Sequence, residues 1–239
     1  MIPLRDANPV RRTPIITIAT IVACTVVFAY TLGIEAREGT AGLETFFDTW
    51  GVVPAKLVAA WKAGDYLSHE TLTVFTSMFL HVNLIHLAGN MIYLWIFGNN
   101  IEDKLGRFWF IGFYLLGGVA AVVTQVLIDP TSEVPMIGAS GAISAVLGAY
   151  LVLFPGARIL SLVFLGFFYQ LIEVPAVLVL GFWFVLQLID GIASLGMTDA
   201  SGGVAFFAHI GGFVFGALVG LVVRAVARRG GSAGPAAVG

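Results

Sequence analysis

Charged side chains are scarce in this chain of 239 residues. Only 11% of the residues are charged and 59% are apolar, and the mean hydropathy is +0.96. Because soluble domains carry about 25% charged residues, this composition excludes an ordinary soluble protein and predicts an integral membrane protein. The formal net charge is −2 and no basic patch is interleaved with aromatic residues, so nothing indicates a nucleic-acid partner.

Cysteine and internal repeats are also nearly absent. Cys24 is the single cysteine, which excludes an intrachain disulfide framework and a cysteine metal cluster. We interpret it as a small buried hydrophobic residue. No segment recurs at a period of about 20–50 residues, and the sequence has no obvious two-fold repeat of the kind on which many transporters are built.

Long apolar runs, in contrast, are abundant. About 20 apolar residues cross a bilayer as a helix, and the sequence holds six candidate spans, at 13–33, 82–101, 108–128, 138–155, 175–192 and 203–226. The first span follows three arginines, as in a signal peptide, but its apolar part exceeds the roughly 7–15 residues of such a segment. We therefore predict an all-α, polytopic membrane protein whose six-helix membrane domain covers 13–229.

The distribution of lysine and arginine predicts the topology. Six spans place both termini on one face of the membrane. That face then holds most of the cationic residues: Arg5, Arg11, Arg12, Lys104, Arg107, Arg158, Arg224, Arg228 and Arg229. The opposite face holds only Arg37, Lys56 and Lys62. Because cationic loops stay in the cytoplasm, we expect the N-terminal tail (1–12) and the C-terminus to be cytoplasmic. The compact chain favours a bacterial plasma membrane.

Three segments outside the spans also carry predictions. The first external loop, 34–79, is long enough to be structured, and 53–61 within it is amphipathic and expected to lie in the membrane plane. The apolar segment 159–172 is either interfacial, an extension of the fourth span, or a seventh crossing, although a seventh crossing would spoil the charge distribution. The Gly/Ala-rich tail, 230–239, is expected to be disordered.

A serine and a histidine occur inside the predicted spans. Ser140 heads the fourth span, and His209 lies within the sixth. A hydroxyl or imidazole at membrane depth is costly unless it faces the protein interior or water. Ser140 follows Gly138, which permits unusual backbone angles, and the free N–H groups at a helix start can stabilise an oxyanion.

Small residues recur every four positions in the same two spans. In the fourth span they are Ser140, Ser144 and Gly148, with Gly141 beside them, and in the sixth they are Gly212, Gly216 and Gly220. Small residues let helix backbones approach closely in lipid, so we expect these two helices to pack together. His209 lies nearly on the second stripe, and the packing would bring it to Ser140 as the general base of a serine nucleophile.

The remaining buried histidines allow several interpretations. His86 and Asn90 share a helix face and are suited either to donate to an oxyanion or to join two helices. His81, His86 and His209 could instead bind zinc. The chain lacks a His-Glu-x-x-His pattern and a matching carboxylate inside the spans, so we predict no metal. Ser140 alone is also compatible with a helix cap or a packing residue.

Other polar and aromatic residues receive no catalytic role. Glu102 is expected in a solvated or locally bonded turn, Trp183 at the lipid or the interface, and Gln187 has no predicted function. Neither Asp190 nor Asp199 is placed by its spacing to orient His209.

Three motifs together resemble the rhomboid family of intramembrane serine proteases. They are His81-x4-His86-x3-Asn90 in the second span, Gly138-Ala139-Ser140-Gly141-Ala142 at the start of the fourth, and Ala208-His209-x2-Gly212-x3-Gly216 in the sixth. The resemblance covers 75–221. Each motif alone is weak, but their order and their positions in the expected spans are specific.

The resemblance implies a Ser140–His209 dyad without metal or cofactor. It also implies an oxyanion site formed by the Ser140 amide, His86 and Asn90, and a supporting role for His81. It further implies a first loop that lies partly in the membrane, and a fifth span that, with the loop above the site, controls substrate access. The substrates would be transmembrane segments of other proteins. An inactive helix-binding relative and a small transporter remain alternatives, and nothing indicates a particular oligomeric state.

Overall fold

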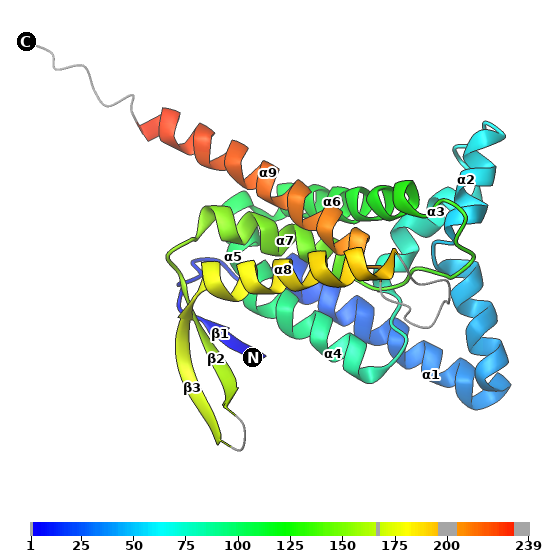
Figure 1. Cartoon of the computed structure of the whole chain (residues 1–239), viewed down its shortest axis with the longest axis horizontal. Helices are drawn as coiled ribbons and strands as arrows, with labels where there is room; N and C mark the ends of the chain where they lie inside the picture. Colours follow the sequence, from blue (N-terminus) through cyan, green and yellow to red (C-terminus); the bar gives the residue numbers. More distant parts are fainter. Residues whose placement is uncertain (1, 166–167, 196–204, 232–239) are drawn as a thin grey trace, which may run out of the picture.

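The computed structural model describes residues 2–165, 168–195 and 205–231, and most of them are helical. The helices, in chain order, are α1 (Ile15–Trp50), α2 (Pro54–Lys62), α3 (His69–Thr76), η1 (Ser77–Phe79), α4 (Leu84–Tyr93), η2 (Leu94–Gly98), α5 (Asn99–Leu105), α6 (Arg107–Ile128), α7 (Ser140–Leu153), α8 (Ala176–Ser194) and α9 (Phe206–Gly231). Strands β1 (Ile2–Asp6), β2 (Arg158–Leu165) and β3 (Phe168–Pro175) form one small sheet. In Figure 1 the sheet lies at one end of the bundle, and α2 and α3 lie at the other.

The predicted class, a mostly helical polytopic membrane protein, is confirmed. Within the described residues, four helices are long and apolar enough to cross a membrane, namely α1, α6, α8 and α9. The segments His69–Phe79 and Leu84–Leu105, bent by 80° against each other, qualify together as a fifth. The fourth predicted span is helical, but α7 has only 14 residues, fewer than the roughly 20 that cross a bilayer.

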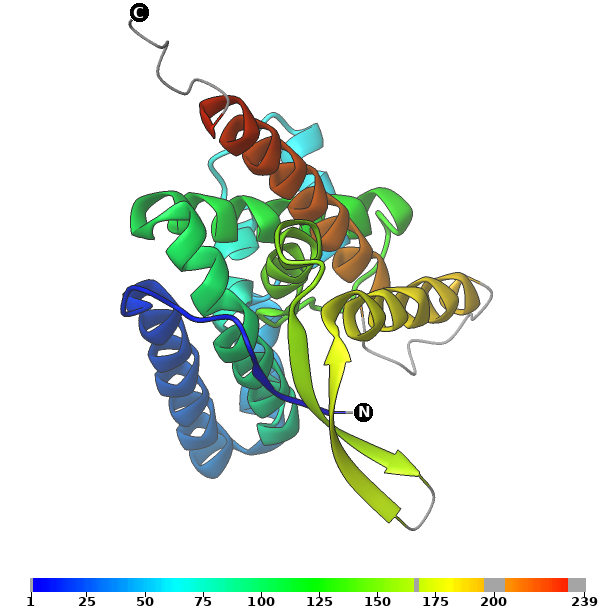
Figure 2. The same ribbon diagram turned by 90° about the vertical axis from the view of Figure 1, so that its left-hand side faces the viewer.

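Helix α7 is short, and protein rather than lipid surrounds it. Every residue from 141 to 150 is buried, and Figure 2 shows α7 in the middle of the bundle. A helix that is apolar on all sides is the one that a bundle buries. At 1.5 Å per residue α7 is about 21 Å long, against a hydrocarbon layer of about 30 Å. One end of α7 therefore lies below the level of a membrane surface.

Glycines allow α9 to pack directly on α7. A Cβ added to Gly212 would collide with the carbonyl oxygen of Gly141, and one added to Gly216 with that of Ala145. Gly148 approaches the backbone of Phe213 in the same way. The other members of the two stripes differ somewhat: Gly220 lies against Ala149 and Val152, whereas a Cβ on Gly141 would point at Ala121 of α6. Backbone contact between α7 and α9 sets the level at which their side chains meet.

The first external loop is largely helical. Helix α1 continues beyond the predicted end of its span and kinks at Gly39, whose φ of +71° is a conformation that favours glycine. The amphipathic segment predicted at 53–61 is helix α2, which buries Pro54 and Leu57. An isolated β-bridge between Val52 and Met136 ties this loop to the segment that precedes α7.

Of the alternatives for 159–172, the extension of the fourth span and the seventh helical crossing were wrong, because this segment forms an antiparallel hairpin of β2 and β3, whereas an interfacial position stays a prediction. Residues of the tail predicted at 1–12 form β1, which pairs with β2. Because of this small sheet, the protein is mostly helical rather than all-α as predicted. An apolar run of this length fits a strand pair as well as a buried helix, and periodicity alone does not separate them. Residues 196–204, which include Asp199, and residues 232–239 lie outside the described residues.

Two buried carboxylates join the N-terminal segment to the bundle. Asp6 Oδ2 accepts hydrogen bonds from Asn100 Nδ2 at 2.6 Å and from the Tyr150 hydroxyl at 2.8 Å. Glu102 is only 3% exposed and bonds to residues about 85 positions away, so the expectation of a solvated or locally bonded turn was wrong. Its carboxylate accepts hydrogen bonds from the amides of Ile16 and Thr17 at 3.0 and 2.8 Å. Glu102 thus satisfies free N–H groups at the start of α1, as a capping residue does.

Candidate active site

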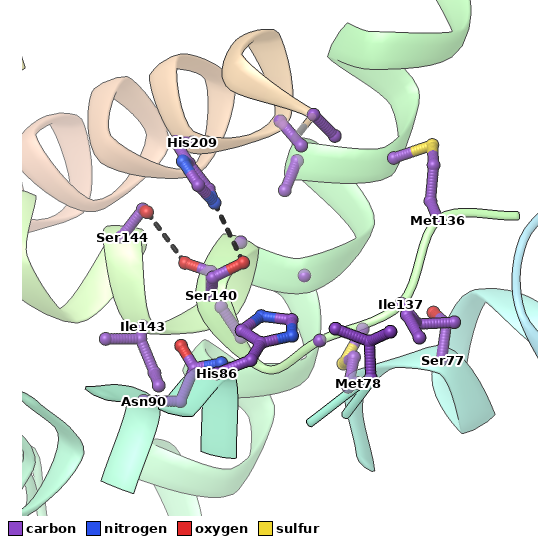
Figure 3. A pocket seen from close by; sticks show the side chains of 18 of the residues that line it. Ser77, Met78, His86, Asn90, Met136, Ile137, Ser140, Ile143, Ser144 and His209 are labelled. Carbon is purple, nitrogen blue, oxygen red and sulfur yellow. Dashed lines mark hydrogen bonds between the residues drawn. The ribbon is translucent and has the colours of Figure 1, made fainter. Parts of the chain in front are cut away.

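Ser140 and His209, which are 69 residues apart in the chain, meet at the start of α7. The Ser140 Oγ and the His209 Nε2 are 2.8 Å apart (Figure 3). Ser140 is the first residue of α7, and His209 lies in the first turn of α9. The close packing of the two helices determines this distance, which is within the range for proton transfer between a nucleophile and a general base.

The backbone before Ser140 depends on Gly138. Gly138 has a φ of +128°, which L side chains rarely adopt, and its amide donates to the Ser77 carbonyl at 2.9 Å. A Cβ at this position would lie 2.9 Å from both Cε1 and Nε2 of His86. Glycine therefore serves two purposes here, since it permits the turn into α7 and leaves room for the imidazole of His86.

His86 and Asn90 lie on the face of α4 that is turned toward Ser140 (Figure 3). Asn83 starts this helix by accepting a hydrogen bond from the His86 amide at 2.8 Å. Asn90 is buried, and its Nδ2 has no hydrogen-bond partner within the described part of the chain. A buried amide donor without an acceptor costs free energy, and beside Ser140 it is free to bond to an acceptor in the cavity.

His81 lies just before α4 and is fully buried. Its ring packs edge-on against that of His86, with centroids 5.1 Å apart. His81 therefore contacts His86 and supports its position, and it forms no hydrogen bond to Ser140.

Two side chains of α8 that received no predicted role contact the imidazole of His209. The Gln187 Oε1 lies 2.6 Å from Nδ1, and the Trp183 ring centroid lies 6.0 Å from that of His209. The expectation that Trp183 faces lipid or the interface was wrong. Trp183 and Gln187 are four residues apart and therefore share one face of α8. A glutamine one turn after a tryptophan inside an apolar span is the sequence feature that could have indicated this polar contact. On α7, the Ser144 hydroxyl donates a hydrogen bond to the backbone carbonyl of Ser140 at 2.7 Å.

A cavity of about 980 Å³ opens over Ser140 and His209. Its lining includes His86, Asn90 and Trp183, and the exposed carboxylates of Glu44 and Asp48 also border it. In the ranges that the structure describes, no three histidine, cysteine, aspartate or glutamate side chains lie close enough to hold a metal ion.

Comparison with known proteins identifies the family. The rhomboid domain model matches residues 68–226, which include all three motifs and both contacts of His209 on α8. The chain therefore belongs to the rhomboid family.

Several curated relatives share parts of this sequence. Rhomboid protein 1, mitochondrial, of Saccharomyces cerevisiae is 30% identical over 160 residues, which cover 65% of this chain and 42% of the relative. Rhomboid protease GluP of Bacillus subtilis is 32% identical over 188 residues, or 79% of this chain and 32% of the relative. Presenilin-associated rhomboid-like protein, mitochondrial, of Bos taurus is 40% identical over 94 residues, or 38% and 25%. The chain thus spans less than half the length of these relatives.

Proposed function

We propose that this chain is an intramembrane serine endopeptidase with Ser140 as nucleophile and His209 as general base. The observation that carries the proposal is the 2.8 Å contact between Oγ and Nε2 at the wall of an open cavity in an apolar helical bundle. A hydrogen-bonded serine and histidine at that depth would be costly without a function. Family membership and the similarity to a rhomboid protease support the assignment.

The reaction follows from the positions of these groups. His209 Nε2 removes the proton of Ser140 as Oγ attacks the carbonyl carbon of the scissile peptide bond. The tetrahedral oxyanion accepts hydrogen bonds from the Ser140 amide, His86 and the Nδ2 of Asn90. Collapse breaks the C–N bond, and the amine leaves with the proton held by His209. Water, deprotonated by His209, then hydrolyses the ester and restores the Ser140 hydroxyl.

The substrate class follows from the location of Ser140. A nucleophile below the surface of a bilayer meets the membrane-spanning segments of other proteins. Such a segment hides its peptide carbonyls in its own helical hydrogen bonds, so it must unwind locally before attack. We therefore expect substrates with small or helix-breaking residues near the cleaved bond, close to the external end of the segment.

The cationic residues support a particular orientation. Arg12, Lys104, Arg107 and Arg158 flank helix ends at the same end of the bundle as the sheet (Figure 1). We assign this end to the cytoplasm, so that both termini are cytoplasmic and the cavity opens to the opposite face. A bacterial plasma membrane is supported by the similarity to the Bacillus subtilis protease over 79% of the chain.

The test compares the purified wild-type protein with Ser140→Ala on a model transmembrane substrate in proteoliposomes. We expect cleavage by the wild-type protein at a single region near one end of the segment, and none by the variant. Cleavage by Ser140→Ala at the wild-type rate would contradict the proposal. Substrate binding without cleavage would favour an inactive relative, and ion-dependent flux without proteolysis would favour a transporter.

A further inference from the structure

One face of α8 is built to contact the start of α9. Trp183, Gln187 and Gly191 recur every four residues on α8, so they lie on one face of it. The first two reach the ring of His209, and a Cβ on Gly191 would lie 3.3 Å from the Cδ1 of Ile210. This stripe brings a third helix to the pair formed by Ser140 and His209.

The contact between Gln187 and His209 determines which ring nitrogen carries the proton. The amide Oε1 of Gln187 only accepts hydrogen bonds, so at 2.6 Å it requires a proton on Nδ1. A neutral imidazole with its proton on Nδ1 has its lone pair on Nε2. That lone pair faces the Ser140 hydroxyl, as a general base requires.

We propose that Gln187 is a positioning residue, which holds His209 in the tautomer and the ring orientation that Ser140 needs. This inference rests on the proposed protease function for its catalytic consequence, and on the hydrogen bond alone for its structural part. When His209 takes the proton of Ser140, the ring becomes cationic and its bond to the Gln187 oxygen becomes a charge-assisted one, which is stronger. A neutral amide thus fills the place that a carboxylate has in a Ser-His-Asp triad.

The surroundings of His209 leave this role to Gln187. The titratable side chains that share the cavity with His209 are His86 and Tyr93 from α4 and, at the border, Glu44 and Asp48 from α1. The hydrogen bonds that the His209 ring forms in the described part of the chain join its Nδ1 to Gln187 and its Nε2 to Ser140. Trp183 adds a ring contact near the range of cation–π attraction, which favours the cationic ring.

Three variants separate positioning from a general structural effect. Gln187→Met keeps a side chain of similar length without the amide oxygen, and Gln187→Glu keeps an oxygen that can only accept. Gln125→Met is the matched control, because the Gln125 Oε1 also bonds to α9, at the Ala208 amide 3.2 Å away, but does not touch the ring.

Two readouts are measured on the full chain in detergent. One is the rate at which a fluorophosphonate probe labels Ser140. The other is the tautomer of His209 from the ¹⁵N shifts of histidine-labelled protein, with the signal assigned through His209→Asn. We expect the Nδ1–H tautomer in the wild-type protein, in Gln187→Glu and in Gln125→Met. In Gln187→Met we expect a mixture of tautomers and labelling slowed by about 10- to 100-fold.

An unchanged tautomer in Gln187→Met, or labelling at the wild-type rate, would overturn the inference. Loss of the proton on Nδ1 in Gln187→Glu, in either the neutral or the cationic ring, would do the same, since an ionised carboxylate cannot donate. A wild-type protein that the probe does not label, but whose tautomer still depends on Gln187, would contradict the protease function and leave the hydrogen-bonded role of Gln187 intact.

Discussion

Two clusters of buried polar side chains lie at opposite ends of α7 and differ in how completely they are bonded. At the C-terminal end, the buried carboxylate of Asp6 accepts hydrogen bonds from both Tyr150 and Asn100, although Asn100 also lines a second cavity of about 550 Å³. At the N-terminal end, Ser140 and Asn90 lie in the wall of a cavity of about 980 Å³, and the buried Nδ2 of Asn90 has no partner among the described residues.

The difference teaches how to distinguish a structural polar cluster from a functional one within a single apolar bundle. A saturated network holds elements together, and its groups have no capacity left for a ligand. An incomplete network beside a cavity costs stability, and the cost is tolerated where a ligand completes it.

The two buried asparagines of the second predicted span should respond in opposite ways. Asn90→Ala removes a proposed oxyanion donor, so we expect activity to fall by about 10²–10³-fold with the thermal midpoint of unfolding unchanged. Asn100→Ala removes a donor to Asp6, so we expect a loss of about 1–3 kcal/mol of stability with activity retained at low temperature. Initial cleavage rates and thermal unfolding curves of both variants measure the two effects. Equal effects on both quantities would contradict the comparison.

Contact between α7 and α9 should be intolerant of side-chain volume. Gly216→Val places a branched side chain against the backbone of Ala145, so we expect destabilisation of at least about 1–3 kcal/mol and loss of Ser140 labelling at elevated temperature. Gly112→Ala in α6 is the control, because a Cβ there meets no atom within 4 Å. Unfolding in a denaturant series measures both, and a Gly216→Val protein as stable as the control would refute close packing as the source of the site geometry.

The hydroxyl of Tyr150 should matter for stability only. Tyr150→Phe deletes the donor to Asp6 while keeping the ring, and we expect a loss of about 1–2 kcal/mol. Because Ser140 lies at the other end of α7, the cleavage rate of the folded protein should stay at the wild-type value. A large change in the rate at a temperature where both proteins are folded would show that the two clusters are coupled.

Asp6 should give stability a small dependence on pH. Burial raises the pKa of its carboxyl above the ordinary value, against the opposing effect of hydrogen bonds from Tyr150 and Asn100. The folded state then binds the proton more tightly than the unfolded state, so this contribution is fully present at low pH and is lost as the pH rises through the raised pKa. Asp6→Asn should flatten this part of the curve of unfolding midpoint against pH. If the unfolding midpoint of the variant has the same slope against pH, another titrating group causes this part of the curve.

The sequence predicts the elements that depend on local pattern. Apolar runs located the membrane helices, and the glycine stripes on α7 and α9 predicted the meeting of Ser140 with His209. Apolar residues at 159–172 are compatible with either a helix or strands, and the choice of a hairpin depends on β1, which pairs with β2 from more than 150 residues away in the chain. No local pattern carries that information.

The partners of polar residues were harder to predict than the residues themselves. Glu102 and Gln187 each stand out as polar groups at or inside an apolar segment. What they bind, the start of α1 and the ring of His209, depends on how distant helices are arranged. A spacing within one helix identifies a shared face, as for His86 and Asn90, but it does not identify the helix that this face meets.

The central claim is that Ser140 is a nucleophile activated by His209. Mass spectrometry after reaction with a fluorophosphonate probe tests it most directly, in the wild-type protein and in His209→Ala. The account predicts one adduct per chain, on the peptide that contains Ser140, and its loss in the variant at equal protein stability. An adduct on another residue, or labelling of Ser140 at the same rate without His209, would contradict it.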